Sequence, residues 1–104
     1  MHARVWQLRI LPGKTEEFRT SVAAVSGLAQ KQHGYRGVIV LGDGSVDSGA
    51  ATLIALWESL EAVRDSERNL FLTQAIARLI GCSDGMPHIV EQPVLATDFR
   101  APGK

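Results

Sequence analysis

The hydrophobic pattern of this chain predicts an α+β domain with the element order strand, helix, strand, strand, helix, strand. Three observations support this prediction. Both ends of the chain alternate apolar and polar residues, two stretches between them carry apolar residues at helical spacing, and a turn-rich segment near the centre separates two apolar runs. A length of 104 residues is typical of one domain, so we expect a single domain over residues 1–104, with an ordered core at about residues 3–99.

The first strand is predicted over residues 3–11. Trp6, Leu8 and Ile10 occupy alternate positions there and therefore share one strongly apolar face. A Pro-Gly pair follows directly and breaks the strand.

The first helix is predicted to begin at Thr15, whose hydroxyl is a suitable N-cap, and two acidic residues follow it in the first turn. We expect the helix to end at Gly34, because glycine adopts the left-handed conformation at a helix end without a steric penalty. Four apolar residues at spacings of four, three and three form its buried stripe: Phe18, Val22, Val25 and Leu28.

The centre of the chain predicts a β-hairpin. Residues 38–41 form a β-branched run, and the glycines and aspartates of residues 42–49 are typical of turns. The return strand, residues 51–57, is apolar at nearly every position, which predicts a central strand of the sheet that is covered on both faces.

A second helical region is predicted from Ser59, which can cap it, to Ile80, with a break at residues 66–69 and Gly81 at its end.

Alternation returns in residues 88–99 and predicts the fourth strand. Pro93 lies within it and has no amide to donate, so we expect this strand at a sheet edge or interrupted by a bulge. Residues 100–104 are expected to fray.

Together these elements predict a ferredoxin-like fold, in which helices cover one face of an antiparallel sheet. We place Trp6, Leu8 and Ile10 on one face of this sheet and Leu53 and Trp57 on the other. In a ferredoxin-like fold the helices cover one face of the sheet, so the second apolar face would be left exposed to water. We therefore expect a homodimer in which two sheets pack face to face, with Trp6 in the dimer core.

Charge and cysteine content argue against several kinds of partner. Eleven Lys and Arg residues offset eleven Asp and Glu residues, so neither nucleic acid nor a membrane surface is an expected partner. One cysteine allows no internal disulfide, and the histidines lack the spacing of a metal site, so no metal is expected. The N-terminal residues contain no secretion or lipidation signal, and a cytoplasmic location is the expectation.

Three segments of the sequence resemble the antibiotic biosynthesis monooxygenase family of dimeric α/β-barrel proteins. They are Leu-Pro-Gly-Lys at 11–14, Gly-Tyr-Arg-Gly at 34–37 and Leu-Trp-Glu-Ser at 56–59, within a match that covers about residues 3–99. The resemblance implies a homodimer whose two sheets form a barrel, with a pocket between sheet and helices in each subunit. It also implies activities that include oxygenation of phenols to quinones without any cofactor.

Four residues are predicted to bind substrate. The amide of Gln7, on the face opposite Trp6, can donate to one ligand oxygen and accept from another, or can instead bond nearby backbone. Arg9 shares that face and could hold an anionic oxygen or extend into solvent. Leu53 and Trp57 belong to the third strand, where Trp57 either contacts a flat ligand or packs in the core.

His33 and Tyr35 are predicted as catalytic groups that transfer protons. The alternative for His33 is a favourable cation near a helix C-terminus, and the alternative for Tyr35 is a loop side chain that covers the edge of the core.

The leading functional hypothesis is a cofactor-independent monooxygenase that forms a quinone from a small hydroxylated aromatic. The main rival is a dimer that binds a small ligand, or regulates, without catalysis. A third hypothesis follows from the family's haem-degrading branch, whose strand asparagine Gln7 could approximate. The ligating histidine of that branch has no counterpart between His33 and His88, which disfavours this hypothesis.

Overall fold

The structure is a computed structural model that describes residues 1–44 and 49–99. Its elements in chain order are β1 (His2–Ile10), α1 (Thr15–Ala29), β2 (Tyr35–Gly42), β3 (Gly49–Trp57), α2 (Leu60–Ser66), α3 (Leu70–Ile80) and β4 (His88–Pro93). The tip of the predicted hairpin at residues 45–48 and the chain end at residues 100–104 lie outside the described residues.

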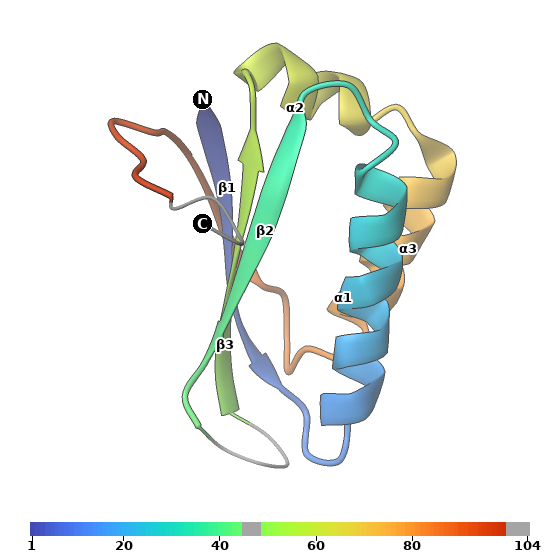
Figure 1. Cartoon of the computed structure of the whole chain (residues 1–104). Helices are drawn as coiled ribbons and strands as arrows, with labels where there is room; N and C mark the ends of the chain where they lie inside the picture. The colour runs from blue at the N-terminus through green and yellow to red at the C-terminus, as the bar shows by residue number, and fades with distance from the viewer. Residues whose placement is uncertain (45–48, 100–104) are drawn as a thin grey trace.

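The four strands form one antiparallel sheet in the order β2-β3-β1-β4, and all three helices lie on one side of it (Figure 1). This arrangement confirms the predicted α+β, ferredoxin-like fold. β3 is a central strand, as its apolar sequence indicated, and β4 lies at the edge, as Pro93 indicated. Residues after Pro93 do not continue the strand.

The register of the sheet corrects the predicted assignment of faces. Trp6 pairs with Leu53, and Leu8 pairs with Ala51. Directly paired residues of antiparallel strands point to the same side, so the apolar residues of β1 and β3 share the face that the helices cover. The prediction that Trp6 and Leu53 lie on opposite faces is therefore wrong, and Trp6 belongs to the core of the single chain.

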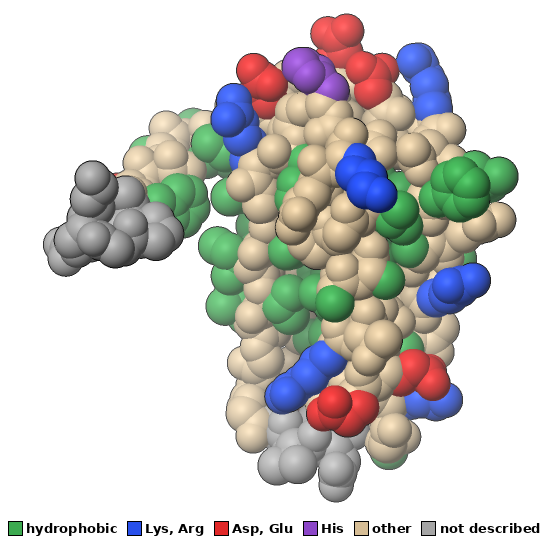
Figure 2. All heavy atoms as spheres, turned by 45° about the vertical axis from the view of Figure 1, so that its right-hand side comes forward, with side chains coloured by type: hydrophobic (Ala, Val, Ile, Leu, Met, Phe, Trp, Pro, Cys, Tyr) green, Lys and Arg blue, Asp and Glu red, His purple; other side chains and the backbone are tan. Residues whose placement is uncertain are grey.

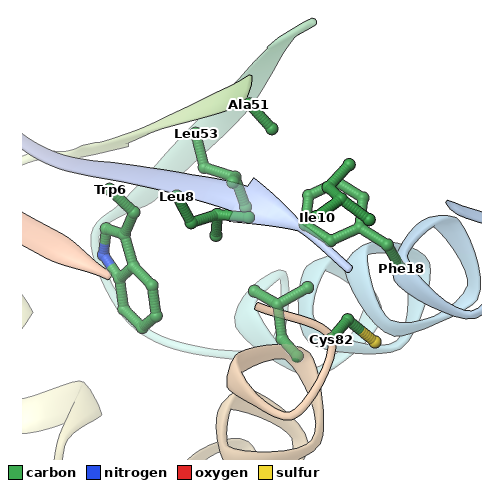
Figure 3. Packing of buried hydrophobic residues seen from close by; sticks show 8 residues of the cluster. Trp6, Leu8, Ile10, Phe18, Ala51, Leu53 and Cys82 are labelled. Atoms are coloured by element: carbon green, nitrogen blue, oxygen red, sulfur yellow. The ribbon is translucent and has the colours of Figure 1, made fainter. Parts of the chain in front are cut away.

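The first part of the core lies between the sheet and α1. Side chains from β1 and β3 converge there on Phe18 and on the buried Cys82, which follows α3 (Figure 3). The chain beyond α3 is tied to the end of β1, because the Leu11 amide donates to the Cys82 carbonyl at 2.9 Å. A second part of the core surrounds Trp57, with Ala29, Ala62, Val63 and Leu72.

Two helix ends differ from their predictions. Lys14, not Thr15, occupies the N-cap position of α1, and its side chain makes no capping hydrogen bond. The helix ends at Ala29 and not at Gly34, because the amides of Lys31 and Gln32 bond carbonyls three residues back and form turns. Gly34 still has the positive φ of +83° that was expected of it, but within the turn that leads into β2. Gly81 ends α3 with a right-handed φ of −61°.

The predicted break in the second helical region is confirmed, and side-chain caps explain it. The Ser59 hydroxyl accepts from the Ala62 amide at 3.1 Å and begins α2. Asn69 then begins α3, because its side-chain oxygen accepts from the Leu72 amide at 2.9 Å.

No helix in the described part of the chain covers the other face of the sheet, which we call the open face (Figure 1). Ile39 and Leu41 project there, with 40% and 51% of their surface exposed. After β4 the Val94 amide donates to the Met1 carbonyl at 2.8 Å. The following residues lie on the side of the sheet away from the helices (Figure 1), and Leu95 and Phe99 are exposed.

The helical side of the molecule carries charges of both signs. Figure 2 shows Lys and Arg side chains interspersed with Asp and Glu on this face, in keeping with the balanced composition. No helix among the described residues is long and apolar enough to span a bilayer.

Candidate functional site

An apolar cavity of about 70 Å³ lies between the sheet and the helices. Its floor is the helix-facing side of β1, β2 and β3, α1 and α3 form its roof, and Ser66 at the end of α2 also lines it. The cavity joins the two parts of the core, because Leu79 belongs to the first part and Leu72 to the second.

The floor is hollow because a small residue occupies its centre. Ala55 of β3 pairs with Val38 of β2 on one side and with Arg4 of β1 on the other. The neighbours of Ala55 on the same face of β3 are the larger Leu53 and Trp57. The short alanine side chain therefore leaves a depression between two bulky ones.

Aromatic rings form one wall of the cavity. Tyr35 begins β2 directly opposite Trp57, and their rings meet edge to face with centroids 5.2 Å apart and an interplanar angle of 70°. The backbone holds this pair in place, since the Glu58 amide donates to the Gly34 carbonyl at 2.7 Å. The sequence segments at 34–37 and 56–59 thus meet in space beside the cavity.

Arg4 is the charged residue that lines the cavity. The central carbon of its guanidinium lies 5.4 Å from the centroid of the Trp6 ring, which is a cation–π geometry. Its nitrogens lie 3.7 Å from a Glu91 oxygen and 3.6 Å from a Glu67 oxygen. Arg4 therefore places a cation at the edge of an otherwise apolar space.

Arg64 holds the two acidic residues near Arg4 through shorter contacts. It donates to both oxygens of Glu91 at 2.9 and 2.8 Å and to Glu67 at 2.9 Å. The hydrogen bonds from Arg64 lower the pKa of Glu91 below its ordinary value, so Glu91 is ionised at neutral pH. The same hydrogen bonds raise the pKa of Arg64.

Comparison with known structures finds the same architecture in a cofactor-independent oxygenase and in candidate antibiotic biosynthesis monooxygenases. A mutant of SnoaB, a cofactor-independent oxygenase from Streptomyces nogalater, superposes with a TM-score of 0.79 at 17% identity, over 92% of this chain and 94% of that chain. A candidate antibiotic biosynthesis monooxygenase from Nitrosomonas europaea gives a TM-score of 0.78 at 10% identity, over 92% and 100% of the two chains. A third candidate, from Caulobacter crescentus, gives 0.77 at 17% identity, over 91% and 90%.

This chain has the antibiotic biosynthesis monooxygenase fold. The predicted resemblance is thereby confirmed at the level of the fold, at sequence identities too low to carry over an activity. No protein-family model and no curated protein matches the sequence.

Within this monooxygenase fold, the cavity brings together three of the six predicted site residues. Tyr35, Leu53 and Trp57 all line it. Gln7 and Arg9 do not: they are exposed and project from the open face, because alternation along β1 turns them away from the helices when Trp6 faces inward.

His33 also lies outside the cavity. It is exposed in the turn before β2, two residues from Tyr35. The monooxygenase fold thus positions Tyr35 as a candidate proton-transfer group in the cavity, and leaves His33 on the surface beside it.

Arg4 and Trp6 are among the cavity residues that the sequence did not predict as site residues. Arg4 and Trp6 occupy even positions of β1, and both line the cavity. The signal that could have found Arg4 is its place two residues before Trp6, on the same face of the strand. The sequence prediction assigned this face of β1 to a dimer core, so residues on it were not considered as cavity residues.

Cys82 is isolated from this cavity chemistry. It is fully buried, and its sulfur lies 3.6 Å from a Glu17 carboxylate oxygen. Burial and then the Glu17 carboxylate raise the pKa of the thiol, so the neutral thiol predominates at neutral pH.

Proposed function

We propose that this protein is a cofactor-independent monooxygenase that converts a small hydroxylated aromatic compound into a quinone. The observation that carries the proposal is the apolar cavity whose walls include the rings of Trp6, Tyr35 and Trp57. A concave, mostly apolar site with a few polar groups is suited to a flat organic ligand. The fold shared with a cofactor-independent oxygenase supports the same chemistry.

Dioxygen alone balances the proposed reaction. A phenol with a hydrogen on the reacting ring carbon combines with one O₂ to give a quinone and one water. One oxygen atom bonds to the ring carbon, and the other leaves as water with the carbon-bound and phenolic hydrogens. The substrate gives up four electrons, and O₂ accepts them, so no external reductant takes part.

The chain's own residues then need to supply only position, a dry environment and proton transfer. The edge-to-face pair of Tyr35 and Trp57 presents ring surface to an aromatic ligand. The Tyr35 hydroxyl can donate a hydrogen bond to a substrate oxygen or accept one from it. His33, which is exposed two residues earlier, stays a predicted proton-transfer group.

We also propose that the working unit is a homodimer, formed through the open face. Exposed Ile39 and Leu41 on that face, and exposed Leu95 and Phe99 beside it, are apolar surface that a second copy would bury. This replaces the expected interface at Trp6, because the helices already cover that face.

The first test is oxygen consumption with a panel of one-ring and two-ring hydroxylated aromatics in metal-free buffer. We expect O₂ uptake with at least one compound, with one quinone formed per O₂ consumed. Measurable binding of these compounds with no O₂ uptake would favour the rival hypothesis of a ligand-binding protein. The absence of both binding and uptake would reject the cavity as an aromatic site.

Cavity variants connect any activity to this site. We expect Ala55→Leu to fill the depression in the floor and to reduce binding of the active compound at least tenfold. Ala24→Leu is the matched control, because Ala24 is exposed on α1 and does not line the cavity. Tyr35→Phe and His33→Gln then test the two predicted proton-transfer groups through kcat, and an unchanged kcat removes that role from the residue tested.

A further inference from the structure

Arg4 has a hydrogen-bonding capacity that the folded chain does not use. Its Nε atom is buried and has no hydrogen-bond partner within the described residues. Its approaches to Glu91 and Glu67, at 3.7 and 3.6 Å, bring opposite charges close without forming hydrogen bonds. Buried donors in native proteins are nearly always paired, so this exception calls for an explanation.

Arg64 explains why the two carboxylates do not satisfy Arg4. Both oxygens of Glu91 already accept hydrogen bonds from Arg64, and Glu67 accepts a third. A guanidinium that grips a carboxylate through two parallel bonds makes the stronger pair. The neighbouring acids are therefore engaged elsewhere, and Arg4 keeps donors available.

The available donors belong to a residue that lines the cavity. The Arg4 guanidinium lies over the Trp6 ring, and both side chains border the same space. The Arg4 side chain is 22% exposed, so it lies where the apolar cavity approaches water. A cation in such surroundings stabilises an anionic oxygen more strongly than it would in bulk water.

We propose that Arg4 binds the ionised oxygen of an aromatic ligand, and that the site selects acidic phenols and holds them as phenolates. The inference rests on the proposed function, in which the phenolate is the electron-rich form that reacts with O₂. The phenolic proton passes to solvent at the exposed edge beside Arg4, and the negative charge stays on the oxygen that Arg4 contacts.

Arg64 supports the proposed role of Arg4 because it holds the Glu91 carboxylate. If Arg64 were absent, Glu91 would be free to pair with Arg4, its cross-strand neighbour on β4. Arg64 is therefore a positioning residue: it does not line the cavity, but it keeps Glu91 from occupying the donors of Arg4.

The test uses 4-nitrophenol as a probe, because its phenol and phenolate forms absorb at different wavelengths. Binding is measured by equilibrium dialysis, and the pKa of the bound probe by absorbance titration. We expect the pKa of bound 4-nitrophenol to lie below that of free 4-nitrophenol, with an ionisation constant at least tenfold higher in the bound state. In Arg4→Met the probe should still bind, with a pKa at or above the free value, and Arg4→Lys should retain part of the shift.

Two further variants separate this role from a general effect of charge. We expect Arg64→Met to move the bound pKa back toward the free value. Arg68→Met is the matched control: it removes an exposed cation one residue from Glu67, outside the cavity, and should leave the bound pKa unchanged. An equal loss in Arg64→Met and Arg68→Met would overturn the role of Arg64.

The outcomes distinguish the inference from the proposed function. A probe that binds to the unaltered protein with no lowering of its pKa overturns the role of Arg4 and leaves the oxygenase proposal standing. A lowered pKa that persists in Arg4→Met, with its fold checked by near-UV circular dichroism, overturns it too. A protein that does not bind 4-nitrophenol overturns the role of Arg4, and one that also binds no compound of the O₂-uptake panel refutes both proposals.

Discussion

Single residues determine the size and the charge of the cavity. Ala55 opens the floor between Leu53 and Trp57, and the resulting space measures about 70 Å³. An apolar cavity of about 150 Å³ in another protein accommodates benzene. A one-ring ligand therefore requires small movements of the lining side chains, and larger polycyclic compounds require more. This size is the reason why the proposed substrate is a small aromatic compound.

At the same scale, the pairing of Glu91 with Arg64 predicts how stability depends on pH. Hydrogen bonds from Arg64 lower the pKa of Glu91 from its ordinary 4.5 in the folded chain. A carboxyl with a lowered folded pKa adds stability above its unfolded pKa, and this contribution is lost as pH falls through the folded value. We expect Glu91→Gln to be less stable than the unaltered protein at pH 7, and equally stable once the pH lies below the lowered value.

Urea unfolding at a series of pH values measures this difference. The effect at neutral pH should be small, because the pair is partly exposed to solvent. Asp98→Asn is the control, since Asp98 is an exposed carboxyl beyond β4. A stability difference for Glu91→Gln that persists unchanged into acid would show that Glu91 acts through packing rather than through its charge.

At the scale of the elements, the sequence specified the strands well and the faces of the sheet poorly. Alternation shows that Trp6 and Leu8 share a face within β1, but it does not show which residues of another strand lie beside them. β3 is apolar on both sides, so its own pattern identifies no inner face. The pairing of Trp6 with Leu53 shows which residues of β3 share the face of Trp6, and that pairing depends on the whole sheet.

The predicted site residues reflect both results: the strands were predicted correctly, and the faces of the sheet were not. Tyr35 and Trp57 were found because the turn before β2 and the end of β3 carry recognisable sequence segments. Gln7 was assigned to the pocket because Trp6 had been assigned to a dimer, and Arg4 was passed over for the same reason. A local pattern cannot resolve this choice, because it does not show on which side of the sheet the next helix, α1, packs.

The turn at Gly34 provides a prediction for an element junction. Its φ of +83° is unfavourable for any other residue, and an added Cβ would lie 2.6 Å from the Cβ of Ala62 on α2. We expect Gly34→Ala to lower the free energy of unfolding by at least about 2 kcal/mol. The left-handed conformation alone costs about 1–2 kcal/mol for a residue with a Cβ, and the contact with Ala62 adds to this cost. Chemical denaturation measures the loss.

Gly13→Ala separates the two causes. Gly13 has a similar φ of +78°, but a Cβ there would meet no atom within 4 Å. The Gly13→Ala variant should therefore lose only the conformational part of the free energy of unfolding, about 1 kcal/mol. Ala62→Gly combined with Gly34→Ala should recover part of the larger loss by removing the contact. Equal losses for Gly13→Ala and Gly34→Ala would show that the packing of this turn against α2 contributes nothing.

At the scale of the whole molecule, the described helices complete the core on one side of the sheet and leave the other side uncovered. Leu8 is 8% exposed within a single chain, so an aspartate at this position should unfold the protein rather than merely separate two copies. The open face differs, because Ile39 and Leu41 are exposed there and the folded chain does not depend on burying them. This contrast identifies the residues with which assembly can be tested.

We therefore predict that Ile39→Asp yields a folded monomer, whereas the unaltered protein sediments at twice the chain mass of 11.3 kDa. An aspartate in a buried interface would leave a charge without a partner, which opposes association far more than it opposes folding of an exposed strand position. Leu70→Asp is the matched control, because Leu70 is also exposed, at 64%, but lies on α3 at the opposite side of the molecule. Sedimentation velocity distinguishes the species, and circular dichroism confirms that each variant is folded. Dissociation in Leu70→Asp but not in Ile39→Asp would place the interface on the helices, and a monomeric unaltered protein would reject the dimer altogether.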